Sequence, residues 1–337
     1  MFKTRFISVL NFNYNKVNQR TIMANEKIYK YTSIETALMI LKNDKLLLRN
    51  PALFNDPFDT NVKRNKDDID RVKKLTIAFT SIGLLVSLLK DPNIGDKVKK
   101  HPLFKAAKLE YHGLIAALKA HPYFEGNIAF NTLYKIIGLK SSAFKEKALE
   151  TQNSFEQVID ESLKISKDNL LVTCFSKTNK SILMWSHYAN SHTGVCIEYE
   201  RPDSQDFLDI TYSKKRPTLK LYDLISHVFA EIILNNKDTQ LSDIELAKEV
   251  IKPFLVKSTE WKYEKEVRCI ITKNTKSKQV QNEDGIYYYL TSKPTKVYIG
   301  CRAKGEKRDE LIKLLKNRNI KYVFLKEDKD NFSLVEK

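Results

Sequence analysis

Short apolar runs rich in β-branched and aromatic residues recur toward both ends of the chain. Proline-free runs of this length and composition are typical of β-strands. They lie at residues 27–31, 170–175, 194–199, 207–212, 286–290, 296–299 and 322–325. Alternation of charged and apolar side chains predicts a further strand through residues 261–272.

Apolar residues recur at helical spacing in several of the segments between these runs. Ser33 is the predicted N-cap of a helix that begins at Ile34, and Ser242 with Glu245 forms a capping-box pattern. The helices predicted in the second half of the chain cover residues 182–190, 219–235, 242–255 and 306–317. Helical periodicity also dominates the lysine-rich segment 67–167, where β-branched runs are few.

These patterns predict a mixed α+β fold built around a twisted, mainly antiparallel sheet. We assign the sheet-containing core to residues 27–66 and 168–337, and a large helical insertion to residues 67–167. Residues 1–26 are interpreted as a basic N-terminal extension.

The formal net charge is +17, from 58 basic and 41 acidic residues. This excess favours encounter with polyanions, which include nucleic acid, an anionic membrane or a phosphate-bearing small molecule. A lysine-rich surface without any such partner accounts for the charge equally well. Nucleic acid is therefore a candidate partner, not a conclusion.

The spacing of the cysteines and the length of the apolar segments indicate in which cellular compartment the chain folds. The four cysteines lie in or beside apolar strand-like runs with no C-x-x-C spacing, which favours buried thiols in a reducing cytoplasm over a disulfide scaffold or a zinc site. The longest apolar region, residues 75–89, is shorter than the roughly 20 residues of a membrane span and predicts a core helix.

Aromatic and histidine side chains are crowded between the predicted strands 170–175 and 194–199. Trp185 and Tyr188 offer faces on which a planar ring could stack, and His187 and His192 offer imidazole hydrogen bonds. The five-residue spacing of the histidines does not favour metal binding. For Trp185 the alternative is core packing, and for Ser176, at the preceding strand end, it is a turn-capping hydroxyl.

Glu264, Glu266 and Arg268 alternate along the predicted strand 261–272, which places them on one face. Two such carboxylates raise each other's pKa unless a cation intervenes, and Arg268 is the nearest cation in the sequence. The triplet could orient a ribose hydroxyl, stabilise a cationic sugar-like transition state or activate a nucleophile. The alternative is a solvated strand face. Sequences typical of phosphate-loop, dinucleotide-binding, serine-hydrolase and zinc-protease motifs are absent.

Four ordered blocks resemble the bacterial domain-of-unknown-function 2971 family. The blocks are the run from IYKYTSIETALMILKNDKLLLRN to PALFNDPFD, then LLVTCFS, MWSHYANSHTGVCIEY and EWKYEKEVRCI. They cover residues 27–60 and 170–275 and leave the helical insertion outside the resemblance.

A more distant similarity is to the ADP-ribosyltransferases. That family places a basic or His residue, then a Ser or Tyr, then a Glu, often as E-x-E, on successive strands. Lys30, Ser176 and the Glu264/Glu266 pair occur here in that order. The resemblance implies NAD as substrate, Glu266 as the carboxylate that stabilises the oxocarbenium-like transition state, and Glu264 as a contact to ribose or acceptor.

The similarity also implies a set of nucleotide-binding side chains. Tyr31 or Trp185 would stack on nicotinamide, His187 would bind a ribose hydroxyl or a phosphate, and Lys30 or Arg268 would meet the pyrophosphate. The complete candidate set is Tyr29, Lys30, Tyr31, Asn55, Asp56, Ser176, Trp185, His187, Tyr188, His192 and Arg268.

Three functions follow from these observations. The leading hypothesis is an NAD-dependent ADP-ribosyltransferase-like enzyme that modifies a protein or nucleic acid. By family context, it would be a bacterial effector or toxin in antiphage defence. A neutralising antitoxin or a defence partner would bind it. The alternative is a non-enzymatic nucleotide- or nucleic-acid-binding sensor module. The third is a metal-dependent nuclease that would use Asp56, Asp59 and the glutamates with His187.

Overall fold

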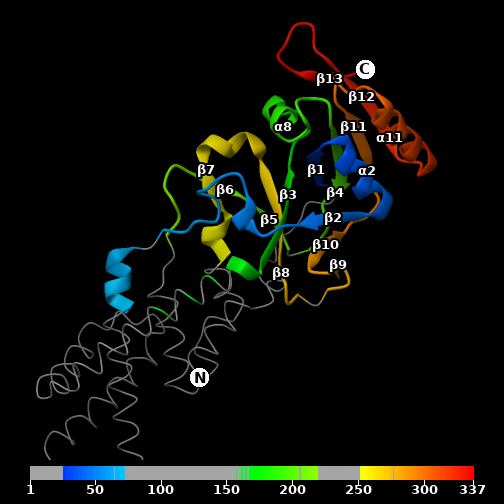
Figure 1. Cartoon of the computed structure of the whole chain (residues 1–337). Helices are drawn as coiled ribbons and strands as arrows, with labels where there is room; N and C mark the ends of the chain where they lie inside the picture. Colours follow the sequence, from blue (N-terminus) through cyan, green and yellow to red (C-terminus); the bar gives the residue numbers. More distant parts are fainter. Residues whose placement is uncertain are drawn as a thin grey trace, which may run out of the picture. The chain divides into compact units, whose positions relative to one another are not determined.

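The structure is a computed structural model, and it describes residues 26–63, 65–72, 157, 161, 164, 167–204, 206–218, 251–275 and 277–337 (Figure 1). Several sequence predictions lie outside these residues. They are the basic extension 1–26 apart from Glu26, nearly all of the insertion 67–167 with its apolar region 75–89, the helix 219–235, and the helix 242–255 as far as residue 250.

The chain divides into two compact units. One consists of Met1–Phe12, Val62–Ser166 and Thr218–Ile251, and the other of Asn13–Asn61, Lys167–Pro217 and Lys252–Lys337. All elements and side chains discussed below belong to the second unit.

The main sheet of the second unit has eight strands in the described residues, in the order β13-β12-β11-β4-β1-β3-β8-β5. Along the chain they are β1 (Lys27–Thr32), β3 (Leu170–Ser176), β4 (Val195–Glu200), β5 (Phe207–Asp209), β8 (Glu266–Thr272), β11 (Lys296–Ile299), β12 (Lys321–Glu327) and β13 (Leu334–Glu336). Neighbouring strands are antiparallel except β11 and β12, which are parallel. The mixed α+β, mainly antiparallel prediction is therefore confirmed.

Two small sheets accompany the main one. Strand β10 (Ile286–Leu290) pairs antiparallel with β2 (Lys45–Leu48) and with β9 (Val280–Glu283). Strand β6 (Thr211–Ser213) pairs in parallel with β7 (Val256–Ser258).

Capping side chains fix the starts of two α-helices. Ser33 caps α2 (Ile34–Asn43) by accepting a hydrogen bond from the Thr36 amide, as predicted, and Ser181 caps α8 (Ile182–His187) in the same way. Helix α11 (Glu306–Asn317) has the predicted bounds and connects the parallel strands β11 and β12, since a parallel pair needs a crossover. Short 3₁₀ helices are η2 (Pro51–Leu53), η4 (Lys252–Leu255) and η5 (Thr259–Glu264).

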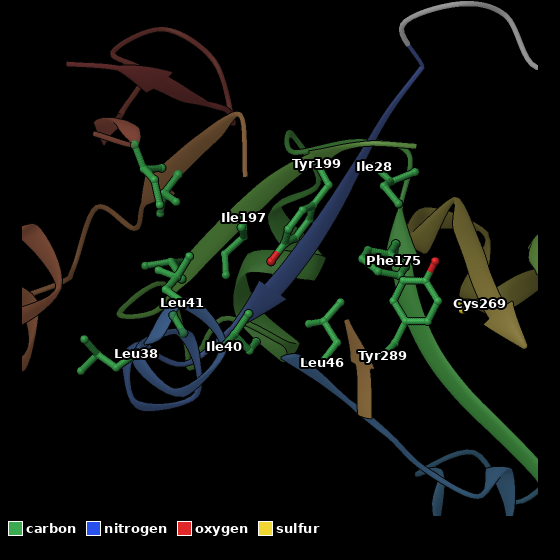
Figure 2. Close-up of a cluster of buried hydrophobic side chains, with 14 of the residues drawn as sticks. Ile28, Leu38, Ile40, Leu41, Leu46, Phe175, Ile197, Tyr199, Cys269 and Tyr289 are labelled. Carbon is green, nitrogen blue, oxygen red and sulfur yellow. The ribbon is translucent and has the colours of Figure 1, made fainter. Parts of the chain in front are cut away.

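Strand alternation divides the apolar side chains between the two faces of the main sheet. On one face, Ile28, Ile197 and Tyr199 pack with Leu38 and Leu41 of α2, and with other members of the large cluster drawn in Figure 2. Leu311 and Leu315 of α11 belong to the same cluster. On the other face, Tyr31, Cys196 and Tyr298 pack with Met184 and Trp185 of α8. The sheet is thus covered by helices on both faces.

Three sequence predictions of strands need correction. The predicted strand 207–212 is two strands in different sheets, since β5 pairs with β8 as far as Asp209 and β6 pairs with β7 from Thr211. Residues 259–264 form η5, so the strand predicted from residue 261 begins only at Glu266. The strand at 322–325 is followed by β13, which the polar sequence around it did not indicate.

All four cysteines are free, and Cys196 and Cys269 are buried, in agreement with the prediction of buried thiols for these two; Cys174 and Cys301 are half-buried. In the described residues, no helix combines the length and the apolar character that a membrane crossing needs.

Gly194 and Gly300 lie where neighbouring backbone segments approach too closely to leave room for a side chain. A Cβ added to Gly300 would lie 2.2 Å from the His192 carbonyl oxygen, and one added to Gly194 would lie 2.2 Å from the Thr32 carbonyl oxygen. Since both neighbours are backbone atoms, they cannot rotate away. The Gly300 amide also donates to the Gly194 carbonyl, so the two positions form one close contact.

We therefore expect Gly300→Ala to lower the free energy of unfolding by about 3 kcal/mol, the upper part of the range for overpacked sites. Urea unfolding of the full chain measures this. Gly285→Ala is the matched control, because its φ of 85° carries a left-handed penalty of about 1–2 kcal/mol but no atom lies within 4 Å of the added Cβ. An equal loss in the two variants would contradict the close-contact argument.

Candidate functional site

Five charged side chains form a buried cluster at the start of β8. They are Asp59, Lys257, Glu264, Glu266 and Arg268, and their side chains are between 1% and 6% exposed. Buried charges persist only when they are paired and hydrogen-bonded. Glu264, Glu266 and Arg268 therefore lie together in one charged cluster, as predicted. The alternative of a solvated strand face is wrong, because all three side chains are buried.

Arg268 is the centre of this cluster. Its guanidinium donates to both carboxylate oxygens of Asp59, at 2.9 and 2.6 Å, and to both oxygens of Glu266, at 2.7 and 3.1 Å. It also donates to the Phe254 carbonyl at 3.3 Å, and its charge lies over the Phe54 ring. Charge-assisted bidentate pairs of this kind are the strongest side-chain hydrogen bonds, so Arg268 fixes both carboxylates in place.

Lys257 is the second cation. Its ammonium donates to Glu264 Oε2 at 2.6 Å and to Glu266 Oε2 at 3.3 Å, and lies 3.6 Å from Asp59 Oδ2. The ammonium also lies over the Trp261 ring at 4.8 Å. Lys257 therefore joins all three carboxylates.

A tight turn, not a strand, brings the two glutamates together. Glu264 ends η5, Lys265 adopts a left-handed conformation with a φ of 45°, and Glu266 begins β8. The turn is held by two hydroxyls, because Ser176 donates to the Glu264 carbonyl and Tyr212 accepts from the Glu266 amide. The prediction that both glutamates lie on one strand is therefore wrong, but the predicted closeness of their carboxylates is confirmed.

The two glutamates have opposite electrostatic environments. Burial raises the pKa of Glu264, and Lys257 only partly offsets this effect. For Glu266, burial acts in the same direction, but Arg268 and Lys257 outweigh it and lower the pKa from 4.5 to about 2. With three acids and two bases in the cluster, Glu264 is the carboxyl group that most readily carries a proton.

Glu264 is also the member of the cluster that is connected to the surface. Its Oε1 accepts a hydrogen bond of 2.6 Å from the half-buried Tyr188 hydroxyl, which also interacts with the exposed side chain of Asn55. Beside them, the exposed His187 Nδ1 lies 3.0 Å from the Tyr263 hydroxyl. We call Asn55, His187, Tyr188 and Tyr263 the rim.

Three of the predicted positions form one row across the sheet. Tyr29 of β1 lies directly opposite Ser176 of β3, and Ser176 lies directly opposite Glu266 of β8. Directly opposed residues on neighbouring strands point to the same face. The register therefore brings together segments separated by more than 140 and 80 residues.

Lys30 does not belong to this row. Since it lies between Tyr29 and Tyr31, its side chain points to the opposite face, where it donates to Thr173 Oγ1 at 3.1 Å and to the Cys174 carbonyl at 2.9 Å. Its charge lies over the Phe175 ring, and burial lowers its pKa. The structure therefore does not bring Lys30 together with the glutamates on one face.

The two residues predicted to stack on nicotinamide are in the core. Trp185 is 0% exposed and its indole nitrogen donates to the Asn179 carbonyl, so the packing alternative holds. Tyr31 is 6% exposed, packs edge-on against Trp185 and donates to the Thr178 carbonyl. Neither ring face is available to a ligand in this structure.

Three other predicted residues have local roles. Ser176 is fully buried and its hydroxyl also accepts from the Thr178 amide, which is the turn-capping alternative. Asp56 is buried and accepts from the Phe58 amide. His192 has a left-handed φ of 70°, and its Nδ1 is buried without a hydrogen-bond partner, with burial and then Arg302 lowering its pKa. It lies beside Gly300, and its carbonyl accepts from the Arg302 amide.

Lys257, Tyr212 and Tyr263 were not predicted from the sequence, and Asp59 was predicted only as a nuclease ligand. A signal for Lys257 was present, because it follows the apolar run Phe254–Leu255–Val256, where a lysine is rarely buried without an acidic partner. Tyr212 and Tyr263 had no comparable signal.

In the described residues, no three or more His, Cys, Asp or Glu side chains are arranged to hold a metal ion. Asp59, Glu264 and Glu266, which the nuclease hypothesis required as ligands, are instead paired with Arg268 and Lys257. The geometry gives that hypothesis no support.

Fold and site together define an α+β protein with a mainly antiparallel sheet and a buried ion-pair cluster at one end of β8. Residues 184–269 match the family model described as Protein of unknown function (DUF2971), which is the family that the sequence blocks resemble. The matched segment contains His187, Tyr188, Lys257 and both glutamates. In the same comparisons, no curated protein and no solved structure matched the chain.

Removing Arg268 should leave Asp59 and Glu266 as buried charges that Lys257 alone cannot neutralise. We expect Arg268→Gln to lower the free energy of unfolding by about 3–5 kcal/mol, as for other broken buried ion pairs. Lys265→Gln is the control, because Lys265 is exposed in the adjacent turn and should change stability by less than about 0.5 kcal/mol. Urea unfolding of both variants measures these changes. If Arg268→Gln lowers the free energy of unfolding no more than Lys265→Gln does, the cluster does not stabilise the fold.

The lowered pKa of Glu266 predicts a pH dependence. A group whose pKa falls from 4.5 in the unfolded chain to about 2 in the folded chain stabilises the fold above pH 4.5, and this contribution is lost as the pH falls toward 2. The unfolding free energy of the protein should therefore decrease more steeply between pH 4.5 and 2 than that of Glu266→Gln. Parallel profiles for the two proteins would refute the assignment.

Proposed function

We propose that this chain is an NAD-using, ADP-ribosyltransferase-like enzyme that transfers ADP-ribose to a protein or nucleic-acid acceptor. One observation carries the proposal: Tyr29, Ser176 and Glu266 lie directly opposite one another on three neighbouring strands, with Glu264 at the adjoining turn. Ser176 and the glutamates occupy the second and third positions of the order that the resemblance requires, whereas Tyr29 stands where that order has a basic residue or His.

The local contacts favour Glu264 over Glu266 as the reactive carboxylate. Both oxygens of Glu266 accept hydrogen bonds from Arg268, and its charge is neutralised within the cluster. Glu264 Oε1 has the Tyr188 phenol as its hydrogen-bond donor, and Tyr188 reaches the rim. A ribose hydroxyl is the same kind of donor and can replace the phenol there. Glu266 and Arg268 then act as positioning residues.

The proposed chemistry is displacement at the ribose carbon that carries nicotinamide. The bond from this carbon to the nicotinamide nitrogen breaks, and its electron pair leaves with nicotinamide. A lone pair of the acceptor forms the new bond, and the acceptor's proton passes to Glu264 or to water. The ribose gains positive charge in the transition state, which a nearby carboxylate stabilises electrostatically.

The rim provides suitable contacts for the rest of the substrate. His187 and Asn55 are exposed, and together with Tyr263 they offer hydrogen bonds to ribose hydroxyls. A net charge of +17 supports a nucleic-acid acceptor or an anionic partner protein. The effector or toxin role, in antiphage defence and with a neutralising partner, is the part of the proposal that comes from the family resemblance alone.

The experiment is incubation of the purified chain with adenine-labelled NAD and bacterial lysate. We expect label transfer or NAD loss, and a decrease of about 100-fold or more in Glu264→Gln, as for removal of a group that stabilises transition-state charge. Glu260→Gln, an exposed residue of the same 3₁₀ helix, is the charge-matched control and should retain the activity. Absence of label transfer and of NAD loss with the folded protein would exclude the enzyme.

A non-enzymatic nucleotide-binding module is the second candidate, and a specific observation favours it. Glu264 and Glu266 are both buried and bound to cations, which is the arrangement of a structural support beneath a binding rim. Under this function, NAD or another nucleotide binds without turnover, and His187→Ala weakens that binding while stability is unchanged.

A further inference from the structure

A second polar site lies at the amino-terminal ends of the parallel strands β11 and β12. The structure has a cavity of about 610 Å³ there, lined among others by Glu198, Thr295, Lys296, Lys321 and Tyr322. This volume is within the range of small-molecule sites in proteins. No part of the Glu264 cluster lines it.

Glu198 gives the cavity a buried acceptor. It is 9% exposed, its Oε1 accepts from the Thr295 hydroxyl at 2.6 Å, and its Oε2 accepts from the Tyr298 hydroxyl at 2.8 Å. Tyr29 also donates to this carboxylate, and burial followed by Glu198 raises the pKa of Tyr29 to about 12. The described residues place hydroxyl groups, and no lysine or arginine within ion-pair distance, around Glu198. A carboxylate has about four lone-pair positions, so one acceptor site remains for a ligand hydroxyl.

Two lysines stand next to this carboxylate. Lys296 lies directly opposite Glu198 on β4 and directly opposite Lys321 on β12. Like charges in directly opposed positions of a sheet are destabilising. Lys296 is paired with Glu336 at 2.6 Å, whereas Lys321 has no ion-pair partner in the part of the chain that the structure describes. Lys321 is thus the lysine of the cavity whose charge an anion would neutralise.

We infer that this cavity binds a small phosphate ester that carries free hydroxyl groups, such as a phosphorylated sugar. The phosphate binds the ammonium of Lys321, and a ligand hydroxyl donates to Glu198. Both features of the cavity, the lysine at its wall and the carboxylate surrounded by hydroxyls, are satisfied by one ligand of this class.

The inference is independent of the proposed NAD chemistry. Strand β11 is separated from β8 by β4, β1 and β3, and four strand spacings of about 4.8 Å amount to roughly 19 Å. The two sites are therefore distinct, and failure of one leaves the other untouched. The polar row continues between them, since Tyr29 lies directly opposite Glu198 as well as Ser176.

Titration calorimetry of the full chain with ribose 5-phosphate, inorganic phosphate and ribose tests the inference. We expect ribose 5-phosphate to bind more tightly than inorganic phosphate, and added salt to weaken binding. Lys321→Gln should weaken both phosphate compounds roughly fivefold to tenfold, the effect of one unit charge near the surface. Glu198→Gln should reduce the preference for ribose 5-phosphate over inorganic phosphate.

Lys313→Gln is the matched control, because Lys313 is an exposed lysine of α11 that does not line the cavity, and it should bind like the unmodified protein. Melting temperatures establish that Lys321→Gln is folded. The inference is overturned if neither phosphate compound binds at millimolar concentration, or if Lys321→Gln binds as tightly as the control. Equal affinity for ribose 5-phosphate and inorganic phosphate would overturn the role of Glu198.

Discussion

The double bidentate ion pair of Arg268 with Asp59 and Glu266 is the interaction on which the site depends. It connects the loop after η2 to the start of β8, two segments more than 200 residues apart in the sequence. A guanidinium presents its donors in a fixed plane, so both carboxylates are held in one geometry. The turn at Lys265, the position of Glu264 and the contact of Tyr188 with Glu264 all follow from that fixed start of β8.

Strand register explains how a buried ion pair comes to lie beside an exposed rim. Because side chains alternate along a strand, the face that carries Tyr29, Ser176 and Glu266 is the face covered by α8, and Tyr188, the C-cap of α8, donates to Glu264. The opposite face carries Lys30, with the large apolar cluster. A shift of one residue in β1 would exchange Tyr29 and Lys30 between these faces.

Local pattern was sufficient for most elements of the fold. Helical period predicted α2 and α11 well, with Ser33 as the cap of α2, and apolar runs predicted β1, β3, β4, β10 and β11. The strand predicted through residue 261 failed because alternation of charges continues across η5, and a left-handed Lys265 leaves no signature in the sequence. The burial of Trp185 depends on the packing of α8 on the sheet, which no local pattern encodes. Alternation along β1 separates Lys30 from Tyr29, but which of the two shares a face with the glutamates depends on strand register.

The two glutamates show why residue type alone could not assign the site. Glu264 and Glu266 are two positions apart, yet burial dominates one and cations dominate the other, so their pKa values move in opposite directions. Pairs of carboxyl groups separated in this way commonly divide the roles of proton carrier and permanent charge. In this site Arg268 and Lys257 lower the pKa of Glu266, whereas burial raises the pKa of Glu264, so Glu264 is the one that protonates first as the pH falls. The carboxylate nearer to the rim is thus also the one whose charge can change.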